Sequence, residues 1–363
     1  MHRLLKRQIT KILKKNPEEL PPEYQRLFQD ISEAYQNYDN EQRLLERVQS
    51  LNAEEINRHK ERERELAIAH SKLALLESFT RFVPKEFLHF LSKKDIQDIA
   101  LGDAVQSEMT ILFTDIRSFT SLSEKMSVED NFKFLNAYLS RMGPIITQHH
   151  GFIDKFIGDA IMALFPPGAA QNAVRAAISM RQALQKYNSS RLQKGYLPID
   201  TGIGINTGLV MLGTLGSQER LSTTVIGDAV NLAARLESLT KSVGSNIIIT
   251  EFLFNQLPNP DEFCLRRVGV VKVLGKEQPV NIYEVFDADP PESLEGKKNN
   301  RPLFEEALNY YLATDYTKAR ETFARCVEAC PQDLVAAKYI DRCTKILGLL
   351  SAAAQEIALT QQK

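Results

Sequence analysis

A strand that ends in an acidic residue is the feature that most constrains this fold. Residues Met109 to Thr114 are apolar or hydroxylic and carry no charge, a pattern typical of a buried strand. Asp115 follows directly, and Ser118 and Thr120 are residue types that favour the start of a helix. Asp115 therefore either caps that helix or offers its carboxylate, beside neighbouring backbone carbonyls, to a hard divalent cation.

Strand and helix patterns alternate over residues 109–287, which we expect to form one catalytic domain. An apolar three-and-four repeat from Phe132 to Ile146 predicts a long helix. Two strand-like runs at 151–156 and 160–165 predict a hairpin with Gly158 and Asp159 at its tip. Later patterns predict strands at 199–206, 209–214, 223–226, 247–249, 263–273 and 280–285, and helices at 169–187 and 228–239. This order is typical of an α+β sandwich of ferredoxin-like kind.

The hairpin supplies a second acidic residue for the end of the first strand. In a ferredoxin-like sheet the first strand and this hairpin are neighbours, so we expect Asp115 and Asp159 to lie close together. Two adjacent carboxylates repel each other unless a proton or a cation lies between them. Mg²⁺ is commonly bound by one or two carboxylates together with substrate phosphates, and a pair of such ions favours phosphoryl chemistry.

Four motifs occur in order: FTDIRSFT at 113–120, DKFIGDAIMALF at 154–165, GINTG at 204–208 and TVIGDAVNLAARLE at 224–237. Together they resemble the class III nucleotidyl cyclase family over roughly residues 105–286. The resemblance implies a ferredoxin-like class III cyclase catalytic domain. It also implies conversion of a nucleoside triphosphate to its 3′,5′-cyclic monophosphate and pyrophosphate.

The resemblance assigns metal-binding and catalytic roles to five positions. It places two Mg²⁺ or Mn²⁺ ions per active site on Asp115, Asp159 and the backbone carbonyl of Ile116. It places Asn231 at the ribose and Arg235 at the α-phosphate, where charge develops. Asn231 and Arg235 are four residues apart and share a helix face, and the planar guanidinium suits multidentate binding of phosphate oxygens.

The resemblance also assigns a pair of residues to the purine base. Lys155 and Thr224 fall on the base-recognising positions of the family. A lysine donates to adenine N1 and a hydroxyl accepts from the exocyclic amine, whereas guanine presents the opposite pattern. Guanylate-forming relatives tend to carry Glu and Cys there, so this pair favours ATP. Threonine rather than aspartate at 224 also resembles the subset of cyclases described as responding to bicarbonate.

Further contacts with the substrate are expected from Phe119 and from a basic residue near the terminal phosphates. Leu274 stands where many relatives carry a lysine. We therefore expect Lys276 to bind the terminal phosphates, with Lys272 as the alternative.

The family places each active site between two catalytic domains, one giving the aspartates and the other giving Lys, Thr, Asn and Arg. This chain holds a single such domain with all of these residues, so we expect a homodimer. The alternatives are a guanylate cyclase and a cyclase-like module that senses nucleotide without turnover. The complete set of Asp115, Asp159, Asn231 and Arg235 favours an enzyme.

The flanking segments are predicted to be largely helical. Residues 1–80 form a stalk, in which Leu44, Val48 and Leu51 suggest either an imperfect coiled coil or a solvated helix packed on its own chain. Residues 81–108 form a junction, 288–300 a polar linker and 351–363 a tail. Residues 301–350 resemble one tetratricopeptide unit, which cannot bury its own face and must pack on the central domain, a second copy or a partner.

Composition narrows the setting and the partners. The net charge of −1 gives no bias toward nucleic acid, and no apolar run is long enough for a transmembrane helix. The basic N-terminus lacks the apolar core of a secretory signal. Four scattered cysteines indicate a reducing, cytoplasmic setting. Besides ATP and a second copy, the candidate partners are bicarbonate or a protein regulator acting through the N-terminal helices or the C-terminal repeat.

Overall fold

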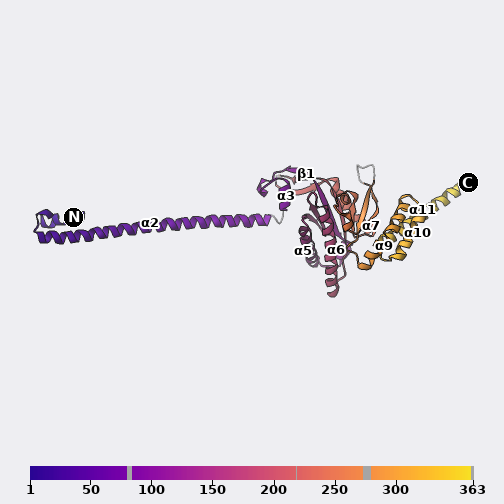
Figure 1. Cartoon of the computed structure of the whole chain (residues 1–363), viewed down its shortest axis with the longest axis horizontal. Coiled ribbons are helices and arrows are strands. Elements are labelled where there is room, and N and C mark those ends of the chain that lie inside the picture. The colour runs from indigo at the N-terminus through magenta and orange to yellow at the C-terminus, as the bar shows by residue number, and fades with distance from the viewer. Residues whose placement is uncertain (80–83, 218, 273–278, 361–363) are drawn as a thin grey trace. The chain divides into compact units, whose positions relative to one another are not determined.

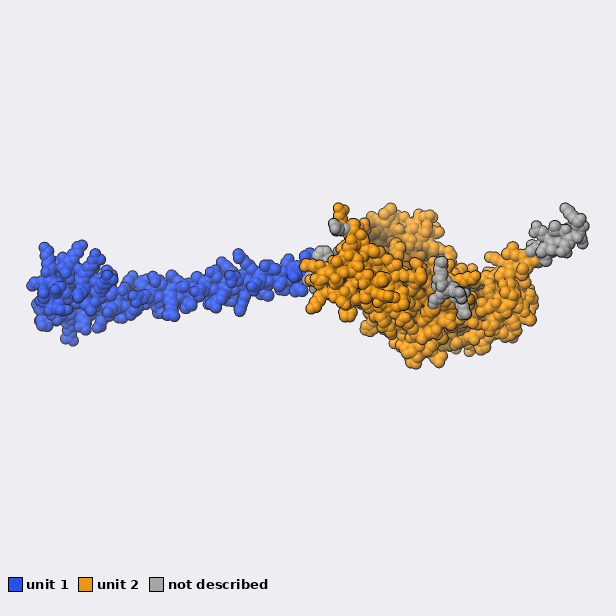
Figure 2. Space-filling model, turned by 90° about the horizontal axis from the view of Figure 1, so that it is seen from above, with its two compact units in different colours: residues 1–81 blue, residues 82–363 orange. Residues whose placement is uncertain are grey.

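The computed structural model describes residues 1–79, 84–217, 219–272 and 279–360. The chain divides into two compact units, residues 1–81 and 82–363 (Figure 2). Among the described residues, none of the helices combines the length and apolarity needed to cross a membrane.

The N-terminal unit is built on one long helix. Helix α1 (Arg3–Leu13) buries Leu5 and Ile9, and a short 3₁₀ helix, η1 (Pro17–Glu19), precedes the 58-residue helix α2 (Pro22–Phe79). Leu44, Val48 and Leu51 of α2 are exposed. These three residues are therefore not packed on their own chain, and the coiled coil stays a prediction.

The second unit is organised around one mixed eight-stranded sheet (Figure 1). The strand order is β2-β3-β1-β4-β6-β8-β7, and β5 pairs with β4. Strand β1 lies between antiparallel partners β3 and β4, whereas β4 and β6 are parallel. The strands are β1 (Ala104–Ile116), β2 (Phe152–Ile157), β3 (Ala160–Phe165), β4 (Thr201–Gly216), β5 (Leu221–Ile226), β6 (Ile247–Thr250), β7 (Leu265–Val271) and β8 (Val280–Val285). The α+β class predicted from the sequence is confirmed.

The largest differences from the predicted strands concern β1 and β4. Strand β1 begins at Ala104, before the predicted start at 109. The strands predicted at 199–206 and 209–214 are one continuous strand, β4, because Thr207 and Gly208 pair with β1 without interruption. The Thr207 hydroxyl lies 2.8 Å from the Thr110 hydroxyl, which satisfies both buried groups inside the ladder.

Helices cover both faces of the sheet. Side chains alternate along each strand, so Leu112 packs with α5 and α6 on one face while Ile111 packs with α7 on the other. Helix α3 adds the fully buried Phe87 to the second face. In the second unit, the described helical segments before residue 290 are α3 (Lys85–Phe90), η2 (Ile96–Asp98), α4 (Phe119–Ser123), α5 (Val128–Gln148), α6 (Ala170–Gln193), α7 (Asp228–Val243), α8 (Glu251–Phe254) and η3 (Pro260–Glu262).

Three C-terminal helices belong to the same unit as the sheet. They are α9 (Pro291–Leu312), α10 (Tyr316–Ala329) and α11 (Leu334–Thr360). Phe304, Phe323 and Tyr339 share one buried cluster with Leu236 of α7 and Val268 of β7. Of the three packing alternatives, the structure therefore selects the central domain. The resemblance to a tetratricopeptide unit stays a prediction.

The predicted polar linker at 288–300 is wrong. All but its first three residues lie in the first turns of α9, on which Ser293, Lys297 and Asn300 are buried. These residues are spaced by four and three, so they lie on one helix face. Their polar groups have hydrogen-bond partners: the Ser293 hydroxyl donates to Asp289 Oδ2 (3.2 Å), and Asn300 Nδ2 donates to the carbonyl of Cys326 (2.7 Å).

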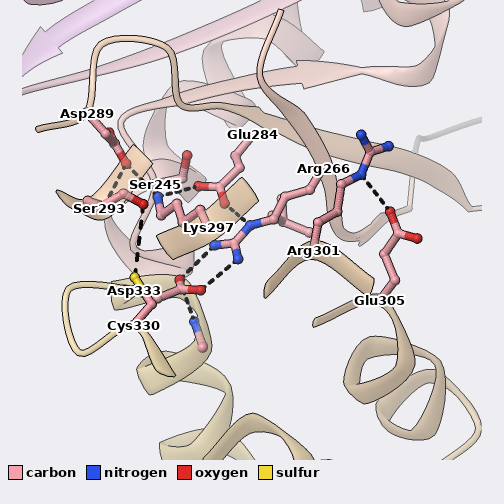
Figure 3. A network of polar contacts seen from close by, with 12 residues as sticks. Ser245, Arg266, Glu284, Asp289, Ser293, Lys297, Arg301, Glu305, Cys330 and Asp333 are labelled. Carbon is pink, nitrogen blue, oxygen red and sulfur yellow. Dashed lines mark hydrogen bonds and ion pairs between the residues drawn. The ribbon is translucent and has the colours of Figure 1, made fainter. Parts of the chain in front are cut away.

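A buried network of charges joins the C-terminal helices to the sheet (Figure 3). Arg266 of β7 is fully buried and pairs with Glu284 of β8. Its two terminal nitrogens donate to the two carboxylate oxygens of Asp333, just before α11, at 2.6 and 2.7 Å. Lys297 of α9 completes the network with Glu284 (3.2 Å) and Asp289 (2.7 Å).

Candidate active site

The end of β1 and the β2–β3 turn bring two carboxylates together. Gly158 adopts the left-handed conformation (φ 64°) that this tight turn requires. The backbone N–H of Ile116 donates to Asp115 Oδ1 (3.0 Å) and to Asp159 Oδ2 (3.2 Å). The predicted convergence of these carboxylates is thus confirmed, and their role as metal ligands stays a prediction.

The electrostatics of this carboxylate pair favour a cation. Burial, together with the hydrogen bond and charge of Asp115, raises the pKa of Asp159 to about 7. Burial and the charge of Asp115 also raise the pKa of Glu237 to about 7. Divalent cations such as Mg²⁺ prefer oxygen ligands of this kind.

The protein itself provides only part of a coordination shell. Within the described ranges, no group of three or more His, Cys, Asp or Glu side chains could hold a metal ion. Asp115, Asp159 and the carbonyl of Ile116 would therefore have to be completed by oxygens from elsewhere. Phosphate oxygens and water are the usual additional ligands of protein-bound Mg²⁺, so these residues fit a metal that arrives with a phosphorylated substrate.

Neutral side chains lie near the carboxylate pair. Tyr138 of α5 and Thr114 of β1 are fully buried. Burial, and then the charges of Asp115 and Asp159, raise the pKa of Tyr138 well above its ordinary range. The tyrosine therefore stays neutral. The helical repeat from Phe132 to Ile146 placed Tyr138 on the inner face of a helix, but it did not signal proximity to the site.

Sequence reasoning also missed Glu237, which closes the fourth motif on α7. The helix lies close against β4 because two glycines leave room for it. A Cβ on Gly204 would lie 2.2 Å from the backbone nitrogen of Glu237, and one on Gly202 would lie 2.7 Å from Glu237 Oε1. Position in the 224–237 motif was the only signal that the sequence offered for Glu237.

The two residues predicted to recognise the base are also brought together. Lys155 Nζ of β2 donates to Thr224 Oγ1 of β5 (3.3 Å), although the two residues are 69 positions apart. Lys155 Nζ also lies 3.2 Å from Asp154 Oδ2. The Asp154 side chain is fully buried, and its pKa is raised by burial, against the opposing charge of Lys155. Asp154 was not singled out from the sequence, although it opens the second motif.

Asn231 and Arg235 are exposed on α7, and Arg235 Nη1 donates to the carbonyl of Lys272 (3.0 Å). At about 100° per residue, Glu237 lies roughly 200° around the helix from Arg235. The charge of Asp115 in the same chain contributes to the raised pKa of Glu237. Among the contacts recorded for the described residues, none joins Asn231 or Arg235 to Asp115 or Asp159.

The other residues predicted to contact the substrate are Phe119, Lys276 and Lys272. Phe119 is half-buried and stacks on Phe134, with ring centroids 6.4 Å apart, so at least part of its surface serves the core. Lys276 and Leu274 lie outside the described residues. Lys272 is exposed at the end of β7.

Comparison with known proteins identifies the family. The model of the adenylate and guanylate cyclase catalytic domain matches residues 103–285, about half of the chain. The chain therefore belongs to the adenylate and guanylate cyclase family.

Two curated relatives and one solved structure illustrate the similarity. The chain is 42% identical over 291 residues to the terminal-differentiation-specific adenylate cyclase of Dictyostelium discoideum, covering 77% of this chain and 14% of the relative. It is 50% identical over 226 residues to an adenylate cyclase of Anabaena cylindrica, covering 61% of this chain and 45% of the relative. The chain thus spans less than half the length of either relative. A bacterial light-regulated adenylyl cyclase matches in structure with a TM-score of 0.53 and 25% identity, over 61% of this chain and 62% of that chain.

Proposed function

We propose that this chain is an adenylate cyclase that converts ATP to 3′,5′-cyclic AMP and pyrophosphate. The observation that carries the proposal is the convergence of Asp115 and Asp159 on the single N–H of Ile116. The contact between Lys155 and Thr224 supports adenine as the base. The two relatives described above, both named adenylate cyclases, agree with this assignment.

The reaction requires one bond to form and one to break at the α-phosphorus. The 3′-oxygen of ATP bonds to that phosphorus, the bond to the bridging oxygen of the β-phosphate breaks, and the hydroxyl proton is released. Bound Mg²⁺ or Mn²⁺ would supply charge neutralisation and a more acidic 3′-hydroxyl. Asp115, Asp159 and the carbonyl of Ile116 would hold two such ions.

The other residues would orient ATP and balance charge. Asn231 would fix the ribose so that the 3′-oxygen faces the phosphorus, and Arg235 would stabilise charge on the α-phosphate oxygens. Lys155 would donate to adenine N1 while Thr224 accepts from the exocyclic amine. A half-buried Lys–Thr pair that is already in contact needs little reorganisation to bind the base.

We further propose that the active unit is a homodimer with two equivalent sites. Asn231 and Arg235 share one exposed helix face, whereas Glu237 of the same helix is near enough to Asp115 of its own chain for that charge to raise the pKa of Glu237. A second copy would therefore bring Asn231 and Arg235 to the carboxylate pair. The exposed Leu44, Val48 and Leu51 of α2 are suited to hold two copies together as a coiled coil.

A turnover assay with ATP and GTP, each with Mg²⁺ and with Mn²⁺, tests the activity. We expect cyclic AMP to predominate and specific activity to rise with protein concentration. Predominant cyclic GMP would contradict the roles of Lys155 and Thr224, and binding of ATP without product would favour the nucleotide-sensing module. The same assay with added bicarbonate tests whether bicarbonate raises turnover, as the resemblance of Thr224 to the bicarbonate-responsive subset predicts.

Mixing two inactive variants tests the shared site. Asp159→Ala and Arg235→Ala should each abolish turnover as pure homodimers. Mixed in equal amounts, they should recover about a quarter of wild-type activity, because half the dimers are mixed and each carries one intact site. No recovery, with dimer exchange verified by native mass spectrometry, would place both residues in a site within one chain.

A further inference from the structure

The first turns of α11 contact the last residues of α7 and the loop that follows them, together called the 242–246 loop. Arg342 Nη2 donates to the carbonyl of Ser242 (2.9 Å). Gly244 has φ 87°, and a Cβ at this position would lie 2.9 Å from the carbonyl oxygen of Leu334. Close approach and the left-handed conformation both favour glycine here. The C-terminal helices therefore hold this loop by direct contact.

The side chain of Arg117, the residue after Ile116, binds both this loop and the residue that precedes β4. Arg117 Nη2 donates to the carbonyl of Ser245 (2.7 Å), and Nη1 lies 3.0 Å from Asp200 Oδ2. The backbone N–H of Arg117 also donates to the carbonyl of Asp200 (2.8 Å). Arg117 directly follows Ile116, whose N–H donates to both acidic side chains.

Arg117 is firmly placed on the β4 side. Its side chain is 21% exposed, and its Asp200 partner is also bound by Arg181 Nη1 (2.5 Å). Arg181 Nη1 donates as well to the carbonyl of Thr201 (3.0 Å), the first residue of β4. Arg117 thus binds the start of β4 and the 242–246 loop at the same time. A planar guanidinium with several donors can do this, whereas the compact ammonium group of a lysine is not suited to it.

The 242–246 loop is not tightly packed on the side that faces α9 and the start of α11. A cavity of about 220 Å³ lies there, and its lining includes Ser245, Asn246, Lys297 and Leu334. A loop that borders a cavity lacks packing contacts on that side. Its position therefore depends on the groups that bind it. These are Arg117 and the N–H of Ile203, which donates to the Asn246 carbonyl (2.8 Å), from the sheet, and α11 from the other side.

We propose that Arg117 is a positioning residue of the metal site and that the C-terminal helices help to set its position through Ser245. Arg117 acts through the adjacent backbone of Ile116, which carries both the predicted carbonyl ligand and the N–H shared by Asp115 and Asp159. The proposal rests on the proposed metal-binding role of that pair. It assigns to α9–α11, which lie outside the residues matched by the family model, a part in shaping the active site.

Mn²⁺ binding to the full chain, measured by electron paramagnetic resonance and by the Mn²⁺-induced rise in Tm, tests the proposal without relying on turnover. Arg117→Lys should raise the half-saturating Mn²⁺ concentration about tenfold, the scale typical of residues that orient metal ligands. Arg342→Gln should act in the same direction by about threefold. Arg301→Gln is the matched control on α9, because Arg301 pairs only with the exposed Glu305 among its recorded ion pairs and should leave Mn²⁺ binding unchanged.

Wild-type Mn²⁺ binding by both Arg117→Lys and Arg342→Gln would overturn the proposal. If Arg117→Lys fails to fold, Arg342→Gln decides, since it must weaken Mn²⁺ binding more than Arg301→Gln does at equal Tm. Altered Mn²⁺ binding in a chain that makes no cyclic nucleotide would uphold the positioning role and reject the proposed function. In an active chain, Arg117→Lys should change the metal dependence of turnover while leaving the KM for ATP at saturating Mn²⁺ near its original value.

Discussion

The two helical attachments of the catalytic sheet, α2 on the N-terminal side and α9–α11 on the C-terminal side, differ in whether their apolar residues are buried. Helix α2 leaves Leu44, Val48 and Leu51 exposed and belongs to a separate compact unit. Helices α9–α11 bury Phe304 and Phe323 in a cluster shared with the sheet. An exposed stripe is suited to meet a partner, whereas a shared core makes the attachment part of one folding unit.

Charge reinforces this difference. The Asn57–Glu65 segment of α2 is a run of mixed charge in which each residue is exposed to solvent. Around Arg266, by contrast, the charges of Glu284, Asp333 and Lys297 are buried. Exposed charges contribute little to stability, whereas removal of one member of a buried set leaves an uncompensated charge. The C-terminal attachment should therefore be sensitive to single substitutions, and α2 should tolerate them.

The largest effect on stability is expected from a substitution that breaks the buried contact between the C-terminal helices and the sheet. Asp333→Ala removes both hydrogen bonds to the terminal nitrogens of Arg266 and should lower the free energy of unfolding by about 3–5 kcal/mol in urea titrations. Glu305→Ala, which removes the exposed pair with Arg301, should cost no more than about 1 kcal/mol. A loss below 1 kcal/mol for Asp333→Ala would mean that the buried network does not hold these helices.

A smaller effect is expected from removing the N-terminal unit. Deletion of residues 1–81 should leave the Tm of the remaining unit unchanged, because the shared core lies entirely within 82–363. The protein concentration for half-maximal cyclase activity should rise about tenfold, since a stalk that joins two copies raises their effective concentration. If the deletion destabilised the remaining unit as much as Asp333→Ala does, the N-terminal unit would be as tightly coupled to the sheet as the C-terminal helices are, which would contradict this prediction.

The smallest effect concerns pH and metal in the catalytic unit. The pKa values of Asp159 and Glu237 are raised to about 7. Between their ordinary values near 4 and about pH 7, the native metal-free chain holds more protons than the unfolded chain, so its stability falls as pH rises. Mn²⁺ competes with these protons and should raise Tm by a few degrees more at pH 8 than at pH 6. Asp159→Asn should abolish this difference.

The sequence predicted those parts of the site that rest on local signals. A strand end and a Gly-Asp turn place Asp115 and Asp159, and the sheet order then brings them together. The contacts of Arg117 could not be predicted, because Ser245 is 128 residues away and no local pattern marks it. Lys297 was assigned to a linker for a related reason, since a polar residue resembles solvent-exposed chain until its buried partners are known.

The bridge between Arg266 and Asp333 also bears on protein engineering. A chimera that joined a different C-terminal module at residue 285, the end of the segment matched by the family model, would leave Arg266 on one side of the junction and Asp333 on the other. The donor module would then have to supply a buried acid in the same place. Replacement at the N-terminal side, near residue 81, would keep Arg266 and Asp333 in the same segment.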